Sequence, residues 1–193
     1  MFIIDETEKN FKYNNIIYTK IHIFYYFFYI LNLKVIKMTK TNAMRILDSA
    51  KIEYVPYEYI PDDNDLTGVH IAEQIGLCPD FVFKTLVARG DKNGLSVFCI
   101  PCAMELDLKK CARVTGDKKI ELLPVKELLP NTGYIRGGCS PIGMKKQFPT
   151  YIDETCLLFD KITVSAGIKG CQLLLDAQKL ISLLNITVAD LTV

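Results

Sequence analysis

Histidine is scarce in this chain of 193 residues, which contains only His22 and His70. Beyond the first 37 residues, a Ser-His-Asp or Cys-His arrangement could be built only around His70, which falls in an amphipathic segment where histidine is more often structural. No H-E-x-x-H motif, P-loop lysine motif or G-x-G-x-x-G motif occurs. These absences exclude the common hydrolytic and nucleotide-binding machinery, and we expect no metal and no cofactor.

An excess of positive charge is also missing. The formal net charge of the whole chain is +1, and from Met38 onward 18 basic residues face 19 acidic ones. Proteins that bind nucleic acid without a partner usually carry a strong excess of positive charge, because phosphate neutralisation supplies most of the non-specific affinity. Any contact with RNA is therefore expected to be local, or to need a partner.

Residues 1–37 contain no Ala, Gly, Pro, Ser or Arg, and five residue types supply 27 of them. Their apolar run, residues 21–36, is shorter than the roughly 20 residues of a spanning helix and carries His22, Asn32 and Lys34. No small-residue cleavage site follows it. We expect 1–37 to be a mis-called upstream extension or a disordered, hydrophobic head, with translation starting at Met38. A signal anchor is the alternative.

Seven cysteines, an odd number, are scattered along the chain. Without a convincing export signal, they are typical of reduced thiols in a cytoplasmic protein. Cys99 and Cys102 form a C-x-x-C that could be a redox pair or half a zinc site. The pair closes an apolar strand instead of opening a helix, so buried small hydrophobic residues are the favoured interpretation.

From Met38 on, short helical and strand patterns interleave without an internal repeat or a regular βαβ rhythm. Helices are predicted at 41–52, 69–77, 105–116, 125–131 and 177–185, with Asp107 as a cap and Gly116 as a stop. Strands are predicted at 53–60, 147–153, 157–167 and 169–177, and a hairpin at 81–101 with its bend at Asn93 and Gly94. The prediction is a single α/β (mixed α+β) domain, 38–193, whose mixed, mostly antiparallel central sheet carries short flanking helices.

Three features could carry chemistry. Lys84 interrupts an apolar strand, where an inward lysine is costly unless it meets an anion or carbonyl; an edge lysine reaching solvent is the alternative. The segment "GYIRGGCSPIGMKK", residues 133–146, combines four glycines with three basic side chains, so its amides could receive an anion or a carbonyl oxygen, or it is only a tight turn. Near Ser165, small residues and one base lie at a strand end.

The segments "FKTLV", "LDLKK", "GYIRGGCSPIGMKK", "FPTYID" and "VSAGIKGCQLLL" occur in that order. In sequence and spacing they closely resemble the YbaK family of Cys-tRNA(Pro) deacylases, relatives of the editing domain of bacterial prolyl-tRNA synthetases. The resemblance runs from about Thr41 to the C-terminus. It implies a YbaK-like fold and a trans-editing enzyme that removes cysteine from mischarged Cys-tRNA(Pro).

The chemistry implied by the resemblance is substrate-assisted: the cysteinyl thiol attacks its own ester carbonyl and leaves as a cyclic thiolactone. Cysteine and proline are similar in volume, and pockets separate isosteres by only ~1–3 kcal/mol, so a second site must inspect the product. The protein then supplies near-attack geometry and donors for the oxyanion.

Carried over position by position, the resemblance implies catalytic roles for Lys84, Gly137 and Ser165. The implied substrate-binding residues are Tyr57, Thr85, Gly138, Cys139, Ser140, Pro141, Gly167, Lys169 and Gln172. The chain departs from the family at Gln172, where some members carry aspartate, and at Cys139, which is usually aliphatic. Leu66 or Thr67 falls near a family phenylalanine.

Prolyl-tRNA synthetase is the expected transient partner, since a near-neutral domain needs help to select its tRNA; Lys145, Lys146 and Lys169 would add a local attraction. Three alternatives stay open. One is a non-catalytic module of the same fold that binds tRNA ends or a synthetase, another is a deacylase for a different small amino acid such as alanine, and the third is a thiol-redox protein. No membrane partner is expected.

Overall fold

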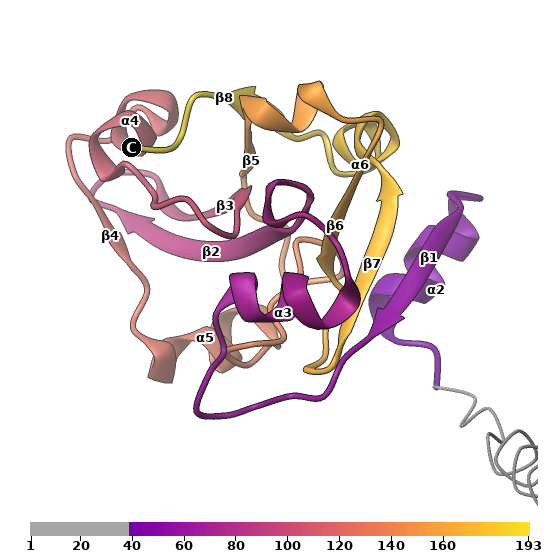
Figure 1. Cartoon of the computed structure of the whole chain (residues 1–193). Helices are drawn as coiled ribbons and strands as arrows, with labels where there is room; N and C mark the ends of the chain where they lie inside the picture. Colours follow the sequence, from indigo (N-terminus) through magenta and orange to yellow (C-terminus); the bar gives the residue numbers. More distant parts are fainter. Residues whose placement is uncertain (1–38) are drawn as a thin grey trace, which may run out of the picture. The chain divides into compact units, whose positions relative to one another are not determined.

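The computed structural model describes residues 39–193, and the compact unit runs from Lys40 to Val193 (Figure 1). The helices are α2 (Asn42–Ser49), α3 (Gly68–Ile75), α4 (Leu108–Thr115), α5 (Val125–Thr132) and α6 (Ala177–Leu184), with short 3-10 turns η1 (Pro79–Phe81) and η2 (Glu154–Leu158). The strands are β1 (Tyr54–Glu58), β2 (Phe83–Gly90), β3 (Gly94–Pro101), β4 (Ile120–Leu122), β5 (Thr150–Asp153), β6 (Lys161–Ser165), β7 (Cys171–Asp176) and β8 (Thr187–Ala189).

The strands form two sheets. The first is fully antiparallel, in the order β1-β7-β6. The second has the order β4-β2-β3-β5-β8, in which β5 runs parallel to both β3 and β8. One isolated parallel bridge, between Val82 and Thr163, links the two sheets. The mixed α+β fold predicted from the sequence is confirmed, and the expected central sheet is divided into these two parts.

The β2–β3 hairpin is the longest pairing and follows the predicted register, from Phe83 opposite Pro101 to Gly90 opposite Gly94. Its bend is fixed by Asp117, whose Oδ1 accepts hydrogen bonds from the amides of Lys92 (2.9 Å) and Asn93 (2.8 Å). Asp117 lies in the connection between α4 and β4, and its side chain therefore holds the hairpin turn in place.

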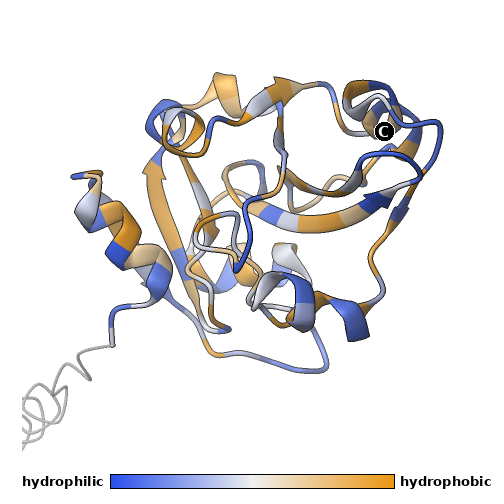
Figure 2. Cartoon of the chain, turned by 180° about the vertical axis from the view of Figure 1, so that it is seen from behind, coloured by the Kyte–Doolittle hydropathy of each residue, from blue (hydrophilic) through white to orange (hydrophobic). Residues whose placement is uncertain are grey.

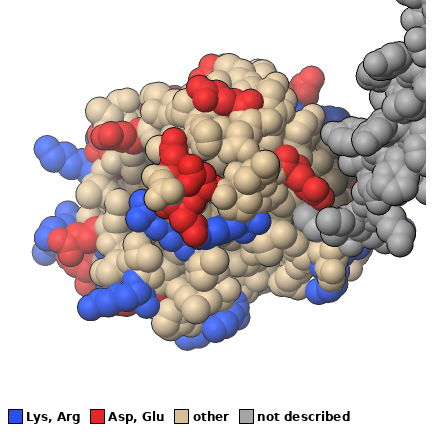
Figure 3. All heavy atoms as spheres, turned by 60° about the horizontal axis from the view of Figure 1, so that its bottom comes forward, with Lys and Arg blue, Asp and Glu red and all other residues tan. Residues whose placement is uncertain are grey.

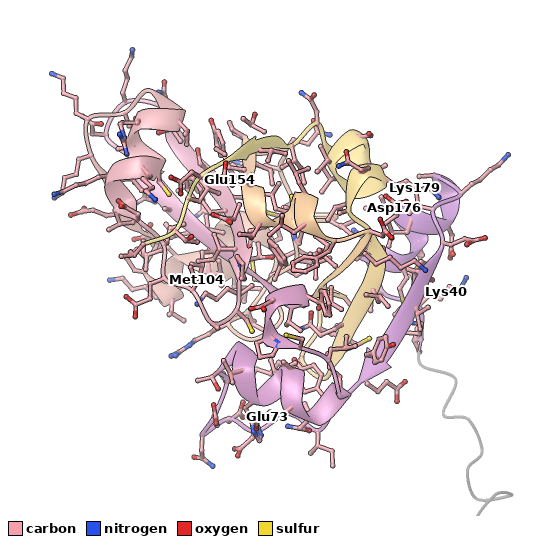
Figure 4. All side chains as sticks on the ribbon, turned by 45° about the horizontal axis from the view of Figure 1, so that its top comes forward. Lys40, Glu73, Met104, Glu154, Asp176 and Lys179 are labelled. Atoms are coloured by element: carbon pink, nitrogen blue, oxygen red, sulfur yellow. The ribbon has the colours of Figure 1, made fainter. Side chains whose placement is uncertain are left out.

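Helix ends follow the local sequence signals. The Asp107 side chain accepts from the amides of Lys109 and Lys110 at the start of α4, and Gly116 ends it in a left-handed conformation, as predicted. Thr41 and Thr67 cap α2 and α3 in the same way. In Figure 4, Asp176 and Lys179 lie together at the start of α6, where Asp176 accepts from the Lys179 amide.

The hairpin sheet is buried on both faces. Ala88, Phe98 and Cys111 form a cluster that involves α4, whereas Val87, Val97 and Leu123 form another that contacts α5 and the glycine-rich loop. Figure 2 shows hydrophobic residues along β7 and hydrophilic ones in the loop between β1 and α3. In Figure 1, α3 and α5 lie below β2.

The prediction for residues 1–37 lies outside the described residues. Within 39–193, no helix is both long and apolar enough to cross a bilayer.

Candidate active site

A cavity of about 390 Å³ lies where β2, β6, β7, α5 and the 133–146 loop meet. Its size falls within the range of small-ligand pockets. Six of the residues implied by the family resemblance line it: Lys84, Thr85, Gly137, Cys139, Ser165 and Gln172. These residues are up to 88 positions apart in the sequence, and the fold gathers them around one space.

Lys84 is half-buried in β2. Its Nζ donates a hydrogen bond to the Cys102 carbonyl oxygen at 2.9 Å. Burial lowers the pKa of Lys84 from its ordinary value of 10.5, and the nearby Cys102 and Glu105 oppose that shift. Lys84 is paired with Ile100 of β3, whereas β4 pairs only with Ala88, Arg89 and Gly90 of β2. Lys84 lines the cavity, so its remaining N–H groups can serve a ligand there.

Ser165, Gln172 and Tyr57 form a row across the three-stranded sheet. Gln172 is paired with Ser165 on one side and with Tyr57 on the other, so the three side chains share a face. Gln172 is 5% exposed, and its Oε1 has no hydrogen-bond partner among residues 39–193. An unpartnered buried acceptor costs free energy, which makes it ready to accept a bond from a ligand.

The glycine-rich loop is held in one shape by its own backbone. The Gly138 amide donates to the Ile135 carbonyl at 3.0 Å, and Gly137 has φ +84°, as the third residue of such a turn requires. A Cβ on Gly138 would lie 3.0 Å from backbone atoms of Ile168 and Lys169, so glycine permits this loop to touch the turn after β6.

Six implied residues do not line the cavity: Tyr57, Gly138, Ser140, Pro141, Gly167 and Lys169. Ser140 is fully buried and its Oγ accepts from the Ile142 amide, while Pro141 borders a separate hollow. The Gly167 amide donates to Ser165 Oγ at 3.2 Å. Lys169 forms an ion pair with Asp63. The structure therefore does not place these six residues in the lining of the cavity, and their substrate-binding roles stay predictions.

The thiols near the cavity are protonated at neutral pH. Burial raises the pKa of Cys139 and of Cys99 to about 12, and that of Cys102 to about 11. Cys99 and Cys102 are buried and free, which agrees with the interpretation as small core residues and argues against a redox pair.

The sequence did not point to several lining residues, among them Arg136 and an apolar wall from β4 and α5 (Leu122, Leu123, Val125 and Leu128). Of the two positions near a family phenylalanine, Leu66 lines the cavity, whereas the Thr67 side chain caps α3. Arg136 lies inside the glycine-rich motif, so its position next to Gly137 could have indicated that it lines the cavity. β4 has only three residues, too few for a periodic pattern.

Charge around the site is mixed. Figure 3 shows basic and acidic side chains next to one another on the face that lies at the bottom of Figure 1, without a continuous basic surface. This distribution matches the near-neutral composition, and it leaves individual cations to act locally.

The fold and the cavity together define an aminoacyl-tRNA editing domain, and the family model of that description matches residues 66–183. The chain belongs to the aminoacyl-tRNA editing domain family. The resemblance stated from its motifs is therefore confirmed, as is the enzyme class of aminoacyl-tRNA deacylases at the level of the family.

A curated relative from Enterococcus faecalis, provisionally named Cys-tRNA(Pro)/Cys-tRNA(Cys) deacylase EbsC, is 48% identical over 153 residues, or 79% of this chain and 93% of the relative. Two solved structures share the fold. One, provisionally described as a trans-editing enzyme for prolyl-tRNA synthetase, has a TM-score of 0.66 at 24% identity and covers 79% of this chain and 97% of its own. The other, the hypothetical protein APE2540, has a TM-score of 0.72 at 18% identity and covers 79% and 99%.

Proposed function

We propose that this protein is a cytoplasmic trans-editing deacylase that removes cysteine from mischarged Cys-tRNA(Pro), with the cysteinyl thiol as nucleophile. One observation carries the proposal: the cavity offers hydrogen-bond donors and acceptors, but its own nucleophile-type groups are not activated. The pKa of Cys139 is raised to about 12, and Ser165 Oγ accepts from an amide. His70 lies on α3, with Nε2 2.9 Å from Gln74 Nε2. A nucleophile that arrives with the substrate suits such a site.

In the proposed reaction, the cysteinyl sulfur attacks the carbonyl carbon of its own ester. A carbon–sulfur bond forms, the bond between the carbonyl carbon and the ribose oxygen breaks, and the thiol proton leaves to solvent. The ribose oxygen takes up a proton, so the products are uncharged tRNA and a thiolactone. The reaction needs no oxidant and no cofactor, only a bound geometry that brings sulfur to carbon.

Three groups are proposed to stabilise this geometry. Lys84 donates to the oxygen that becomes negative during attack, since only one of its N–H groups is used by the Cys102 carbonyl. The Gly137 amide, at the exposed turn of the loop, is a second donor to the same oxygen. Ser165 Oγ fixes the Gly167 turn and presents its hydroxyl proton to the ester.

Gln172 is proposed to recognise the amino group of the bound cysteine. Its buried Oε1 lacks a partner among the described residues and lies in the lining of the cavity. An α-amino group would donate the missing hydrogen bond, and a neutral amide accepts this bond without acting as an acid or base.

Prolyl-tRNA synthetase remains the proposed partner. The mixed surface charge gives weak intrinsic attraction to tRNA, so docking to the synthetase would supply the selection of tRNA(Pro). Lys145, Lys146 and Lys169 would then contribute only near the acceptor end.

The decisive experiment is deacylation of a panel of tRNAs carrying Cys, S-methyl-Cys, Ala or Ser, on tRNA(Pro) and on tRNA(Cys), with and without synthetase. We expect thiolactone from both cysteinyl esters, slow release of the others, and preference for tRNA(Pro) only when synthetase is present. Undiminished release of S-methyl-Cys would refute the substrate-assisted reaction. Faster release of Ala than of Cys would favour an alanine deacylase, and no release would favour a binding module.

A further inference from the structure

Arg136 is a cation of the cavity lining for which the proposed reaction has no use. It occupies the second position of the Ile135–Gly138 turn, where the hydrogen bond from the Gly138 amide to the Ile135 carbonyl fixes the backbone. Gly137 adopts φ +84° at the third position. The turn therefore sets where the side chain leaves the loop, and Arg136 is an exposed residue.

Two other cations of the site, Lys84 and Lys169, are engaged. Lys84 donates to the Cys102 carbonyl, and Lys169 is paired with Asp63. Arg136, by contrast, takes part in no ion pair with a residue of the 39–193 range. No carboxylate of that range therefore receives its five N–H donors.

The chemistry of the substrate indicates which of its groups this arginine could bind. The carboxyl group of the cysteine is esterified and carries no charge, and its amino group is a donor that arginine would not attract. Phosphates are the anions at the end of an aminoacyl-tRNA, and the first of them lies across the same ribose that carries the ester. The planar fork of arginine matches phosphate oxygens in a bidentate manner.

We infer that Arg136 binds the 5′ phosphate of the terminal nucleotide and so orients the ribose with its ester toward Lys84 and Gly137. This inference rests on the proposed function. It assigns Arg136 a positioning role, because the guanidinium touches a part of the substrate that does not react. It would also give a domain without net positive charge a specific cation at the cavity for the end of a tRNA.

The test uses two small substrates that differ only in this phosphate, 3′-O-cysteinyl-adenosine and its 5′-monophosphate. With the full chain, we expect the phosphate to lower KM about three- to fivefold, as for one charge pair at an exposed position, with kcat little changed. Arg136→Ala should abolish this preference, and Arg136→Lys should restore part of it. The matched control is Arg45→Ala, since Arg45 on α2 is also exposed and unpaired among the described residues and lies outside the cavity. It should keep the preference.

With Cys-tRNA, the Arg136→Ala variant should also reduce the slope of log(kcat/KM) against log[salt] by about one. Equal KM values for the two small substrates in the wild type, or a preference that survives Arg136→Ala, would overturn the inference. Thermal denaturation checks the fold of each variant, and Arg136→Gln replaces Arg136→Ala if that variant is unstable.

Calorimetric binding of the corresponding cysteinyl-amide analogues, with and without phosphate, separates this inference from the proposed function. Phosphate-dependent binding that needs Arg136, in a protein that releases no thiolactone, would sustain the phosphate site and refute the deacylase. Thiolactone release without any phosphate dependence would support the deacylase and refute the phosphate site.

Discussion

Replacing Lys84 by methionine removes the ammonium group and keeps most of the side-chain volume. In the structure, Nζ uses one donor on the Cys102 carbonyl at 2.9 Å, which leaves its other N–H groups for the proposed bond to the ester oxygen. Loss of one preorganised donor to an oxyanion typically lowers kcat by about 10²–10³, or ~2.7–4 kcal/mol. We expect Lys84→Met to lose activity on Cys-tRNA(Pro) by this factor.

The same substitution should leave the fold intact. Burial lowers the pKa of Lys84 below 10.5, so the folded state disfavours the charged form, and removal of that charge compensates for the lost hydrogen bond. The free energy of unfolding should change by no more than about 1 kcal/mol at neutral pH. The folded protein binds fewer protons than the unfolded chain between the lowered pKa and 10.5, so stability rises with pH in that window. Lys84→Met should flatten this rise.

The assay is single-turnover release of thiolactone, combined with urea denaturation at several pH values. Lys179→Met is the matched control, because Lys179 is exposed on α6 (Figure 4) and lies outside the cavity. A folded Lys84→Met protein with wild-type turnover would refute the assignment of Lys84 as a donor. A protein that is inactive only because it unfolds would refute the argument about its burial.

Three further predictions follow from single contacts. Gln172→Met should slow deacylation about tenfold. It should also raise the free energy of unfolding by up to ~1 kcal/mol, because a buried acceptor without a partner disappears. A lower stability of this variant in chemical denaturation would contradict the second expectation. Gly138→Ala should destabilise the fold by about 1–3 kcal/mol, since its Cβ would press on the Ile168 and Lys169 backbone at 3.0 Å, and an unchanged urea midpoint would disprove that contact. Native alkylation at pH 8 followed by mass spectrometry should modify exposed Cys78 and spare Cys99 and Cys102, whose pKa values are raised to about 12 and 11; rapid labelling of either would reopen the redox hypothesis.

Local signals in the sequence predicted most of the elements. The cap at Asp107, the stop at Gly116 and the β2–β3 hairpin depend on neighbouring residues, and all three occur in the structure. The strand predicted over 157–167 was wrong in its first part, because Leu157 and Leu158 belong to the 3-10 turn η2 and β6 begins only at Lys161. Apolar residues in a short run do not distinguish a strand from a turn that packs on the core.

Long-range pairing could not be predicted from local patterns. The division into two sheets depends on β1 pairing with β7, more than 100 residues away, and on a single bridge at Val82. For the same reason, the apolar wall of the cavity was missed: Leu122 and Val125 acquire meaning only when α5 packs against the hairpin. The family resemblance pointed to Lys84, Gly137, Ser165 and Gln172, and the fold places these residues around one cavity, whereas their roles remain predictions.

The pairing of β1 with β7 has a consequence for truncated forms of the chain. The middle strand of that sheet, β7, ends at Asp176. Residues after it form hydrogen bonds with earlier parts of the chain, as the Val193 amide does with the Glu105 carbonyl. A fragment that stops before β7 contains Lys84 but lacks the wall of the cavity that carries Gln172. Because β7 is the middle strand of its sheet, such a fragment also lacks the pairing partner of both β1 and β6, and we expect it to have no deacylase activity.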